Sequence, residues 1–402
     1  MSGLFRPGES LAAGVFDDAG LLEALAAVET AWLQVLAADG PAPDDAVVEL
    51  GPFVGAADAA QLGRAAESSG NAVVPLLALV RERLRGDGLD AAAHWLHRGL
   101  TSQDTLDTAL VLLLRDTRNQ VRTPLREVVT TLVDLAERHG ADPATGRTLT
   151  QPAVPVRFGA RVAAWLRGVL SAVDDLDRLV LPAQVGGAAG TLSGVAALVG
   201  ADAAPALATH LAERLGLAPS PPWHTDRAPV TRAGEALTRV TAALGHVAND
   251  VLTGSRPELG ELAEGSGGGS STMPHKSNPV RATLVRRAAL AAPALLAQLH
   301  LAAADTGDER PAGAWHLEWE PLRDLARQTV SATVQTRDLL ADLKVDTARM
   351  AANLAAADGV DAERASLAAL LDRPRPDAWA GADDALVGDA VARARTWLAT
   401  PA

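Results

Sequence analysis

The chain has 402 residues, of which 36 are Lys or Arg and 49 are Asp or Glu, so its formal net charge is −13. It contains no Cys, which excludes disulfide bonds, a thiolate nucleophile, zinc–thiolate sites and iron–sulfur clusters. The acidic balance argues against a general nucleic-acid binder, which needs a basic face, and no apolar run reaches the roughly 18 residues of a membrane span. Since the N-terminus lacks a signal-peptide pattern, we expect a cytoplasmic protein without nucleic-acid or membrane partners.

Apolar residues recur at helical spacing along almost the whole chain. Shorter helices with Gly and Pro breaks are predicted over the first hundred residues. Long helices are predicted over 105–139, 156–181, 231–252, 280–304 and 329–343. Pro124 should kink the first of these without ending it, and Pro155 should open the second. Strand-like alternation is nearly absent, so the fold class we predict is an all-α bundle of long helices.

Composition divides the predicted bundle into three sections. Residues 1–100 form a predicted N-terminal helical domain, and 101–340 form a central domain of long helices. Residues 341–402 form a short C-terminal helical domain, which an Arg-Pro-Arg-Pro stretch interrupts. The glycine-rich run at 265–269 lies between two long helices and does not mark a domain boundary.

The first candidate site is the stretch HRGLTSQD at 97–104. Thr101, followed three residues later by Asp104, predicts a capping box at the start of a long helix. Because a helix N-terminus attracts anions, Thr101, Ser102 and His97 are candidates for holding a carboxylate. An ordinary cap beside a solvated histidine is the plainer alternative. The His-x-x-His pair that ends at His97 lacks a third ligand, so we predict no metal site.

The second candidate site is the loop GSGGGSSTMPHKSNPVRA at 265–282. Its glycines permit a mobile backbone, while Asn278 is a predicted N-cap and Pro279 a predicted first helical residue. The loop therefore brings polar side chains to a helix N-terminus, which suits an anion. These side chains are Ser270, Ser271, Lys276 and Asn278. A flexible linker with an ordinary cap is the alternative that the residues alone leave open.

Three motifs of the chain together resemble those of the fumarase/aspartase superfamily. They are HRGLTSQD at 97–104, GRTLTQP at 146–152 and GSSTMPHKSNP at 269–279. The resemblance runs from about residue 10 to about residue 365. It implies a homotetramer with a central helix bundle, active sites shared between three subunits, a small polycarboxylate substrate and no cofactor.

Within this superfamily the chain is most similar to the 3-carboxy-cis,cis-muconate cycloisomerases. The similar stretches include GGAAGTL at 186–192, PWHTDR at 222–227 and the segment 308–325. In the middle motif, Leu149 stands where several lyases of the superfamily have a proton-donating histidine. Because a carboxylate leaving group needs no proton, this difference favours the muconate reaction over the purine and arginine lyase reactions.

The resemblance also implies roles for individual residues. Ser270 and His97 would be catalytic, with Ser270 handling the proton on the carbon next to a carboxylate. Preorganised donors would stabilise the aci-carboxylate that forms there. The substrate-binding residues would be Thr101, Ser102, Arg147, Gln151, His224, Arg227, Ser271, Met273, Lys276 and Asn278.

Two alternatives remain open at this point. A nitrosuccinate lyase resembles the cycloisomerases and releases nitrite, an anion that also needs no acid. Arg98 and Arg281 stand where cycloisomerases often have an uncharged aromatic residue and a glycine, which favours a changed substrate. A non-catalytic structural protein on the same scaffold is the other alternative, and the intact Ser270, Lys276 and Asn278 argue against it.

Overall fold

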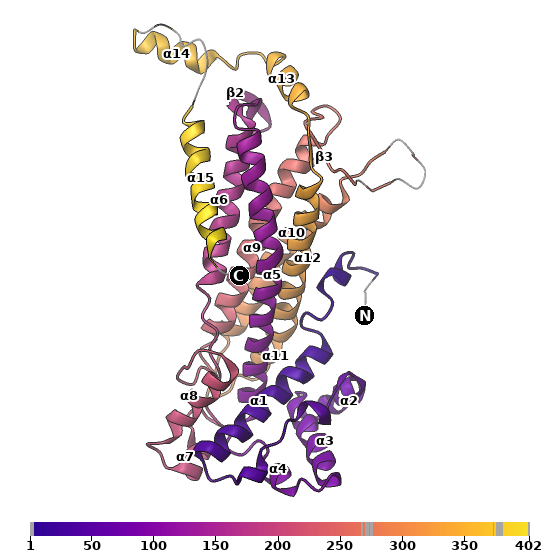
Figure 1. The fold of residues 1–402 in the computed structure, drawn as a ribbon, viewed down its shortest axis with the longest axis vertical. Helices are drawn as coiled ribbons and strands as arrows, with labels where there is room; N and C mark the ends of the chain where they lie inside the picture. The colour runs from indigo at the N-terminus through magenta and orange to yellow at the C-terminus, as the bar shows by residue number, and fades with distance from the viewer. Residues whose placement is uncertain are drawn as a thin grey trace.

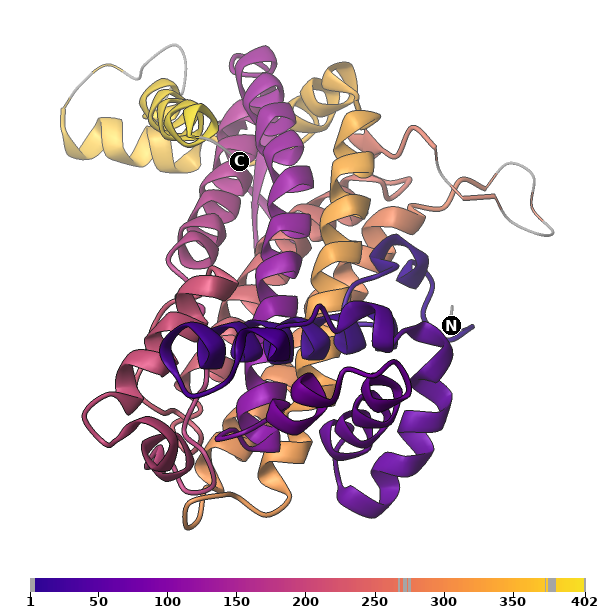
Figure 2. The same ribbon diagram turned by 60° about the horizontal axis from the view of Figure 1, so that its bottom comes forward.

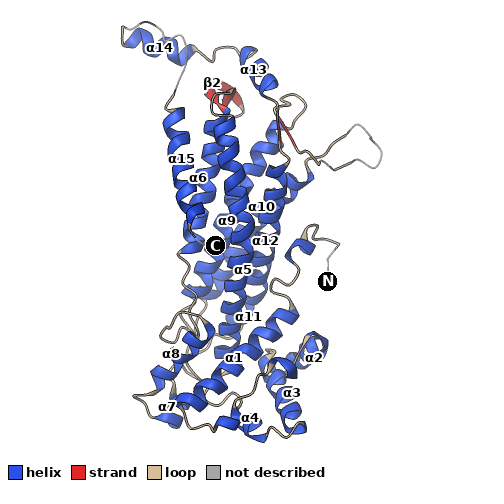
Figure 3. Ribbon diagram, in the orientation of Figure 1, coloured by secondary structure: helices blue, strands red, loops and turns tan. Residues whose placement is uncertain are grey.

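Long helices lie side by side and give the molecule its elongated shape (Figure 1). The computed structural model describes residues 4–266, 268–269, 273, 276–372, 374 and 381–400. The long helices are α5 (Ser102–Arg138), α6 (Phe158–Asp177), α9 (Ala228–Gly254), α10 (Val280–Ala304) and α12 (Trp319–Ala341). The all-α fold class is therefore confirmed, and strands take up only a small part of the molecule (Figure 3).

One end of the bundle, which we call the cap end, holds the N-terminus of α5 and the shorter helices around it (Figure 1). Figure 2 shows α1, in indigo, crossing the long helices. The helices at the cap end are α1 (Asp18–Asp39), α2 (Ala59–Ser69), α3 (Val73–Gly86), α4 (Asp90–Trp95), α7 (Ser193–Val199), α8 (Ala204–Leu215) and α11 (Ala314–Leu317). Single 3-10 turns lie at Glu9–Ala12, Asp44–Ala46, Gly51–Phe53 and Ala56–Asp58.

The opposite end, which we call the hairpin end, carries the antiparallel pair β1 and β2 (Figure 1). A second antiparallel pair, β3 with β4, and two short helices lie nearby. The elements are β1 (Pro143–Thr148), β2 (Gln151–Arg157), β3 (Leu262–Ala263), β4 (Lys344–Val345), α13 (Thr347–Ala355) and α14 (Ala362–Leu370). The last helix, α15 (Asp383–Ala399), returns along α6, where Trp397 Nε1 donates to Asp177 Oδ2 at 3.0 Å.

Apolar stripes of the long helices meet in the core, as their helical periodicity predicts. In α6, Phe158 and Trp165 are buried with their ring centroids 5.9 Å apart. Trp165 Nε1 donates to Asp250 Oδ2 of α9 at 2.6 Å, so its one polar atom is satisfied as well. Each such side chain contributes roughly 1.5–3 kcal/mol through burial, which holds the neighbouring helices in register.

Several predicted boundaries are confirmed and others are wrong. Helix α10 has the predicted bounds, and α5 continues through Pro124. Pro155 does not open α6: it lies in β2, paired with Thr145, because a two-stranded hairpin has free edges that tolerate proline. Helix α12 begins at Trp319, ten residues before its predicted start. The division into 1–100, 101–340 and 341–402 stays a prediction.

Two helices among the described residues, α1 and α10, are long and apolar enough to cross a membrane by length and composition alone. The sequence-based expectation differed because it counted uninterrupted apolar runs, whereas these helices include a few charged residues. The apolar stretch of α1 is 67% buried within the chain, but that of α10 is only 22% buried. Leu290 and Leu301 of α10 are 69% and 65% exposed, so one chain leaves an apolar face of α10 uncovered.

Candidate active site

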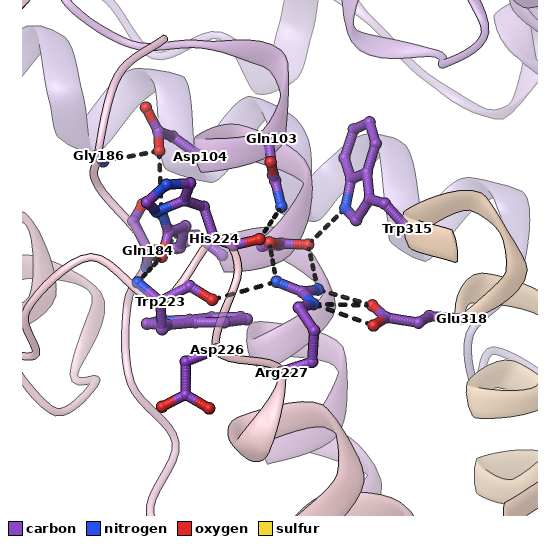
Figure 4. A network of polar contacts seen from close by, with 12 residues as sticks. Gln103, Asp104, Gln184, Gly186, Trp223, His224, Asp226, Arg227, Trp315 and Glu318 are labelled. Carbon is purple, nitrogen blue, oxygen red and sulfur yellow. Dashed lines mark hydrogen bonds and ion pairs between the residues drawn. The ribbon is translucent and has the colours of Figure 1, made fainter. Parts of the chain in front are cut away.

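The N-terminus of α5 is built around the carboxylate of Asp104. Thr101 is the N-cap, and its backbone N–H donates to Asp104 Oδ2 at 3.0 Å, as the predicted capping box requires. The backbone N–H groups of Gly186 and Gly187 donate to the same carboxylate at 2.8 and 2.9 Å. Gln184 Nε2 adds a bond of 3.2 Å (Figure 4). Asp104 therefore ties the start of α5 to a distant segment of the chain, beyond its predicted role as a cap.

Burial raises the pKa of Asp104 to about 6. The cause is the loss of water around a carboxyl group that is only 1% exposed, because desolvation disfavours the charged form. The four hydrogen bonds from Thr101, Gly186, Gly187 and Gln184 act in the opposite direction. The cap end thus contains an acid that changes charge just below neutral pH.

His224 packs directly on Gly190. Gly190 has a φ of +73°, and a Cβ built on it would lie 1.8 Å from Cε1 of the His224 ring. The main-chain carbonyl of His224 accepts a bond of 2.9 Å from Gln103 Nε2 (Figure 4), while its buried Nδ1 has no hydrogen-bond partner among the described residues. Burial, then the charges of Arg310 and Arg227, lower the pKa of His224, so its ring is neutral at pH 7.

Arg227, predicted to bind substrate, is enclosed by carboxylates of its own chain (Figure 4). Its guanidinium donates to Asp107 at 2.8 and 3.1 Å and to Glu318 at 2.7 to 3.2 Å, and it lies 4.9 Å from the ring centroid of Trp223. Trp315 Nε1 also donates to Asp107, at 2.9 Å. Because the Arg227 side chain is 0% exposed, a substrate carboxylate cannot reach it. We therefore correct the prediction: Arg227 is the centre of a buried ion-pair cluster with Asp107 and Glu318.

Arg310 is a candidate site residue that the sequence reasoning missed. It lies in the loop between α10 and α11, and its Nη2 donates to Thr101 Oγ1 at 2.8 Å. The segment 308–325 was singled out only because it resembles the cycloisomerases. Hydrophobic periodicity predicts helices, and it does not predict which residues an arginine in a loop will contact. Arg310 places a positive charge beside the hydroxyl of Thr101, one residue before Ser102 begins α5.

His97 lies on the turn that leads into α5. Its Nδ1 is 2.7 Å from Glu29 Oε1 of α1, and its backbone has a φ of +64°. The structure therefore brings His97, Thr101, Ser102 and His224 to the cap end. Their individual roles stay predictions.

The hairpin end carries the second motif. Arg147 of β1 donates to Glu261 at 2.6 and 3.0 Å and lines a cavity of about 790 Å³, which is of small-molecule size. Gln151 is exposed.

The two-residue turn between the strands is Leu149 and Thr150, both with positive φ, as a type I′ turn requires. Leu149 is 97% exposed, so an apolar side chain with a costly backbone conformation forms the tip.

The third motif is described only at Gly269, Met273 and 276–279, between β3 and α10. Ser270 and Ser271 lie outside the described residues. Met273 and Lys276 are exposed, and Lys276 makes no ion pair within the described part of the chain. Asn278 is not the N-cap as predicted: it exchanges two backbone hydrogen bonds of 2.8 Å with Gly268, so the cap position passes to Pro279.

Within the described residues, a single chain does not bring the first and second motifs together. Helix α5 separates the first motif from the second, and its 37 residues span about 55 Å at 1.5 Å per residue. Thr101 precedes the start of α5, and Arg147 follows its end (Figure 1). Residues that far apart cannot contact one small substrate within one copy of the chain.

Comparisons with known proteins agree with these motifs. The profile of a family described as Lyase matches residues 52–293, which include all three motifs. The chain is 41% identical over 370 residues to nitrosuccinate lyase of Streptomyces davaonensis, covering 88% of this chain and 77% of that protein. It is 39% identical over 365 residues to 3-carboxy-cis,cis-muconate cycloisomerase of Pseudomonas aeruginosa, covering 88% and 78%.

Among solved structures, the fold is similar to that of 3-carboxy-cis,cis-muconate lactonizing enzyme from Pseudomonas putida. The TM-score is 0.85 at 30% sequence identity, covering 96% of this chain and 97% of that chain. A fumarate lyase from Mesorhizobium has a TM-score of 0.78 at 27% identity, covering 96% of this chain and 86% of that one. The resemblance therefore extends over the fold as a whole.

Proposed function

The chain belongs to the Lyase family of the fumarase/aspartase superfamily, and from this we propose that it cycloisomerises 3-carboxy-cis,cis-muconate to 4-carboxymuconolactone in protocatechuate catabolism. One substrate carboxylate oxygen adds to a diene carbon, and the displaced electron pair is held on a second carboxylate as an aci-carboxylate. The neighbouring carbon then takes up one proton, so the reaction is an isomerisation without a cofactor.

The observation that carries the proposal is the cluster of a cation and hydrogen-bond donors at the start of α5. The helix N-terminus, the Thr101 hydroxyl and the Arg310 guanidinium converge there, and each favours a carboxylate. The exposed Leu149 in the middle motif supports a reaction whose leaving group needs no acid. The neutral His224 offers a hydrogen bond without adding charge.

The remaining parts of the site come from the loop. Lys276 and Asn278 stabilise the aci-carboxylate, and Ser270 carries the proton to or from the neighbouring carbon. Because Lys276 is exposed and unpaired with any described residue, its charge is available to a substrate. We propose that Ser271, Met273, Arg147 and Gln151 also bind the substrate.

A homotetramer assembles these parts from different copies. The uncovered apolar face of α10, with Leu290 and Leu301, supports packing against other copies along the bundle. The separation of about 55 Å along α5 supports a site in which the hairpin and loop motifs of other copies meet each cap end.

Nitrosuccinate lyase activity is the second candidate. The observation in its favour is the 41% identity to the Streptomyces davaonensis enzyme, against 39% to the Pseudomonas aeruginosa cycloisomerase. Elimination of nitrite uses the same parts: an aci-carboxylate forms as the α-proton leaves, and the C–N bond then breaks.

An ultraviolet assay with 3-carboxy-cis,cis-muconate tests the proposal, because lactonisation removes the conjugated diene. Loss of absorbance with the wild type and none with Ser270→Ala is the expected result. Turnover of nitrosuccinate alone would replace the proposal by the second candidate. Turnover of both substrates by Ser270→Ala at near wild-type rates would overturn the role of Ser270.

A further inference from the structure

Side chains of α1 and α3 hold three consecutive residues just before α5. Arg81 Nη2 of α3 donates to the carbonyl of Leu96 at 2.9 Å. Trp32 Nε1 of α1 donates to the carbonyl of Arg98 at 2.7 Å. Between them, Glu29 of α1 holds the ring of His97. A turn held at every residue keeps His97 in its left-handed conformation, which a non-glycine residue rarely adopts.

Glu29 is a costly residue to bury at this place. Its side chain is only 2% exposed. Its Oε1 accepts a hydrogen bond from Thr105 Oγ1 at 2.8 Å and lies 2.7 Å from His97 Nδ1. Its Oε2 has no partner among the described residues. A buried carboxylate oxygen without a donor lowers stability. Helix packing alone does not need the charge, since a glutamine of the same shape could occupy the position.

The contact fixes the chemistry of the imidazole. A carboxylate only accepts hydrogen bonds, so His97 Nδ1 must be the donor. Since Nδ1 carries the hydrogen in the neutral ring, Nε2 carries the lone pair. The ring is 14% exposed, so one part of it still reaches the surface beside Thr101.

We infer that Glu29 is a positioning residue for catalysis: it fixes the tautomer and orientation of His97 so that Nε2 acts as an acceptor toward the bound substrate. This inference rests on the proposed function for the identity of that substrate and for the catalytic role of His97. Glu29 lies on α1, outside all three motifs, and acts only through His97.

Glu29→Gln tests the inference, because it removes the charge and keeps the shape. We expect kcat to fall about 10- to 100-fold with KM changed less than about threefold, as for other carboxylates that orient a histidine. The melting temperature should not fall, since the buried charge is removed. In a His97→Asn background the same substitution should have no further effect on kcat, because Glu29 has nothing left to position.

Asp39→Asn is the matched control, since Asp39 lies on the same helix and pairs with His210 at 3.0 Å away from the site. It should leave kcat unchanged. Glu29→Gln with wild-type kcat, or with equal losses in both backgrounds and a lower melting temperature, would overturn the inference.

Solid-state NMR of histidine-labelled protein decides the question without substrate. The His97 resonance, identified by its loss in His97→Asn, should report Nδ1–H in the wild type and change tautomer in Glu29→Gln. If the wild type turns over neither substrate, the proposed function fails, while this readout still tests the positioning role. An Nε2–H tautomer in the wild type would overturn the inference.

Discussion

The cap end and the hairpin end of the bundle differ in how their polar groups are satisfied. At the cap end, Asp104 and Arg227 are buried and bonded to several partners within the chain. At the other end, Lys276 is exposed and Leu149 projects into solvent on a strained turn. Asp104 and Arg227 are therefore satisfied within one copy, whereas Lys276 makes no ion pair within the described part of the chain. We therefore expect substitutions at the two ends to affect stability and activity differently.

Arg227→Met should give the largest effect on stability. It leaves Asp107 and Glu318 buried without their shared cation, and breaking a buried ion pair in this way costs about 3–5 kcal/mol. Urea denaturation at pH 7 measures the loss. An unchanged unfolding midpoint with lost activity would mean that Arg227 binds substrate after all.

Gly190→Ala should cost about 1–3 kcal/mol, because the new Cβ must displace the His224 ring, and turnover should fall with it. Gly200→Ala is the matched control, since Gly200 has a φ of +87° but nothing within 4 Å of its Cβ position. Thermal melts and kcat of both variants separate backbone strain from displacement of the ring. Equal losses of activity would contradict a role for His224 at the site.

Asp104 should make the cap end more stable at pH 5 than at pH 7. Its pKa of about 6 in the folded chain lies above the usual 3.8, so the folded chain binds this proton more tightly than the unfolded chain. Lowering the pH through 6 therefore adds about 1 kcal/mol to the free energy of unfolding. Denaturation of the wild type and Asp104→Asn at both pH values measures this contribution, which the variant should lack. If the free energy of unfolding changes by the same amount between pH 7 and pH 5 in the wild type and in the variant, the pKa of Asp104 is not raised.

Leu149→Asn should give the smallest effect, a gain of about 0.5–1 kcal/mol, because asparagine tolerates the left-handed conformation of a type I′ turn. Leu149→Ala keeps the backbone cost and removes the apolar side chain, so it serves as the control. Differential scanning calorimetry compares the two. If Leu149→Ala and Leu149→Asn raise the free energy of unfolding equally, the cost comes from the exposed leucine side chain and not from its backbone conformation.

The sequence predicted the long helices well because periodic apolar residues and caps are local signals. The bounds of α10 and the capping box of Thr101 are examples. It failed at Pro155, which fits both a first helical turn and an edge strand, so only the tertiary pairing with β1 decides. The motifs named His97 and His224 as candidates, but the contacts of Arg310 and Glu29 and the enclosure of Arg227 involve residues far apart in the chain.

Mixing two inactive variants tests most directly whether the two ends act in different copies of the chain. Lys276→Met removes the loop cation, and His97→Asn removes the cap-end imidazole, so each variant alone should have little activity. Unfolding and refolding them together should restore a substantial fraction of wild-type activity, because some sites then combine an intact cap end with an intact loop. A refolded mixture as inactive as either variant alone would contradict an active site shared between copies.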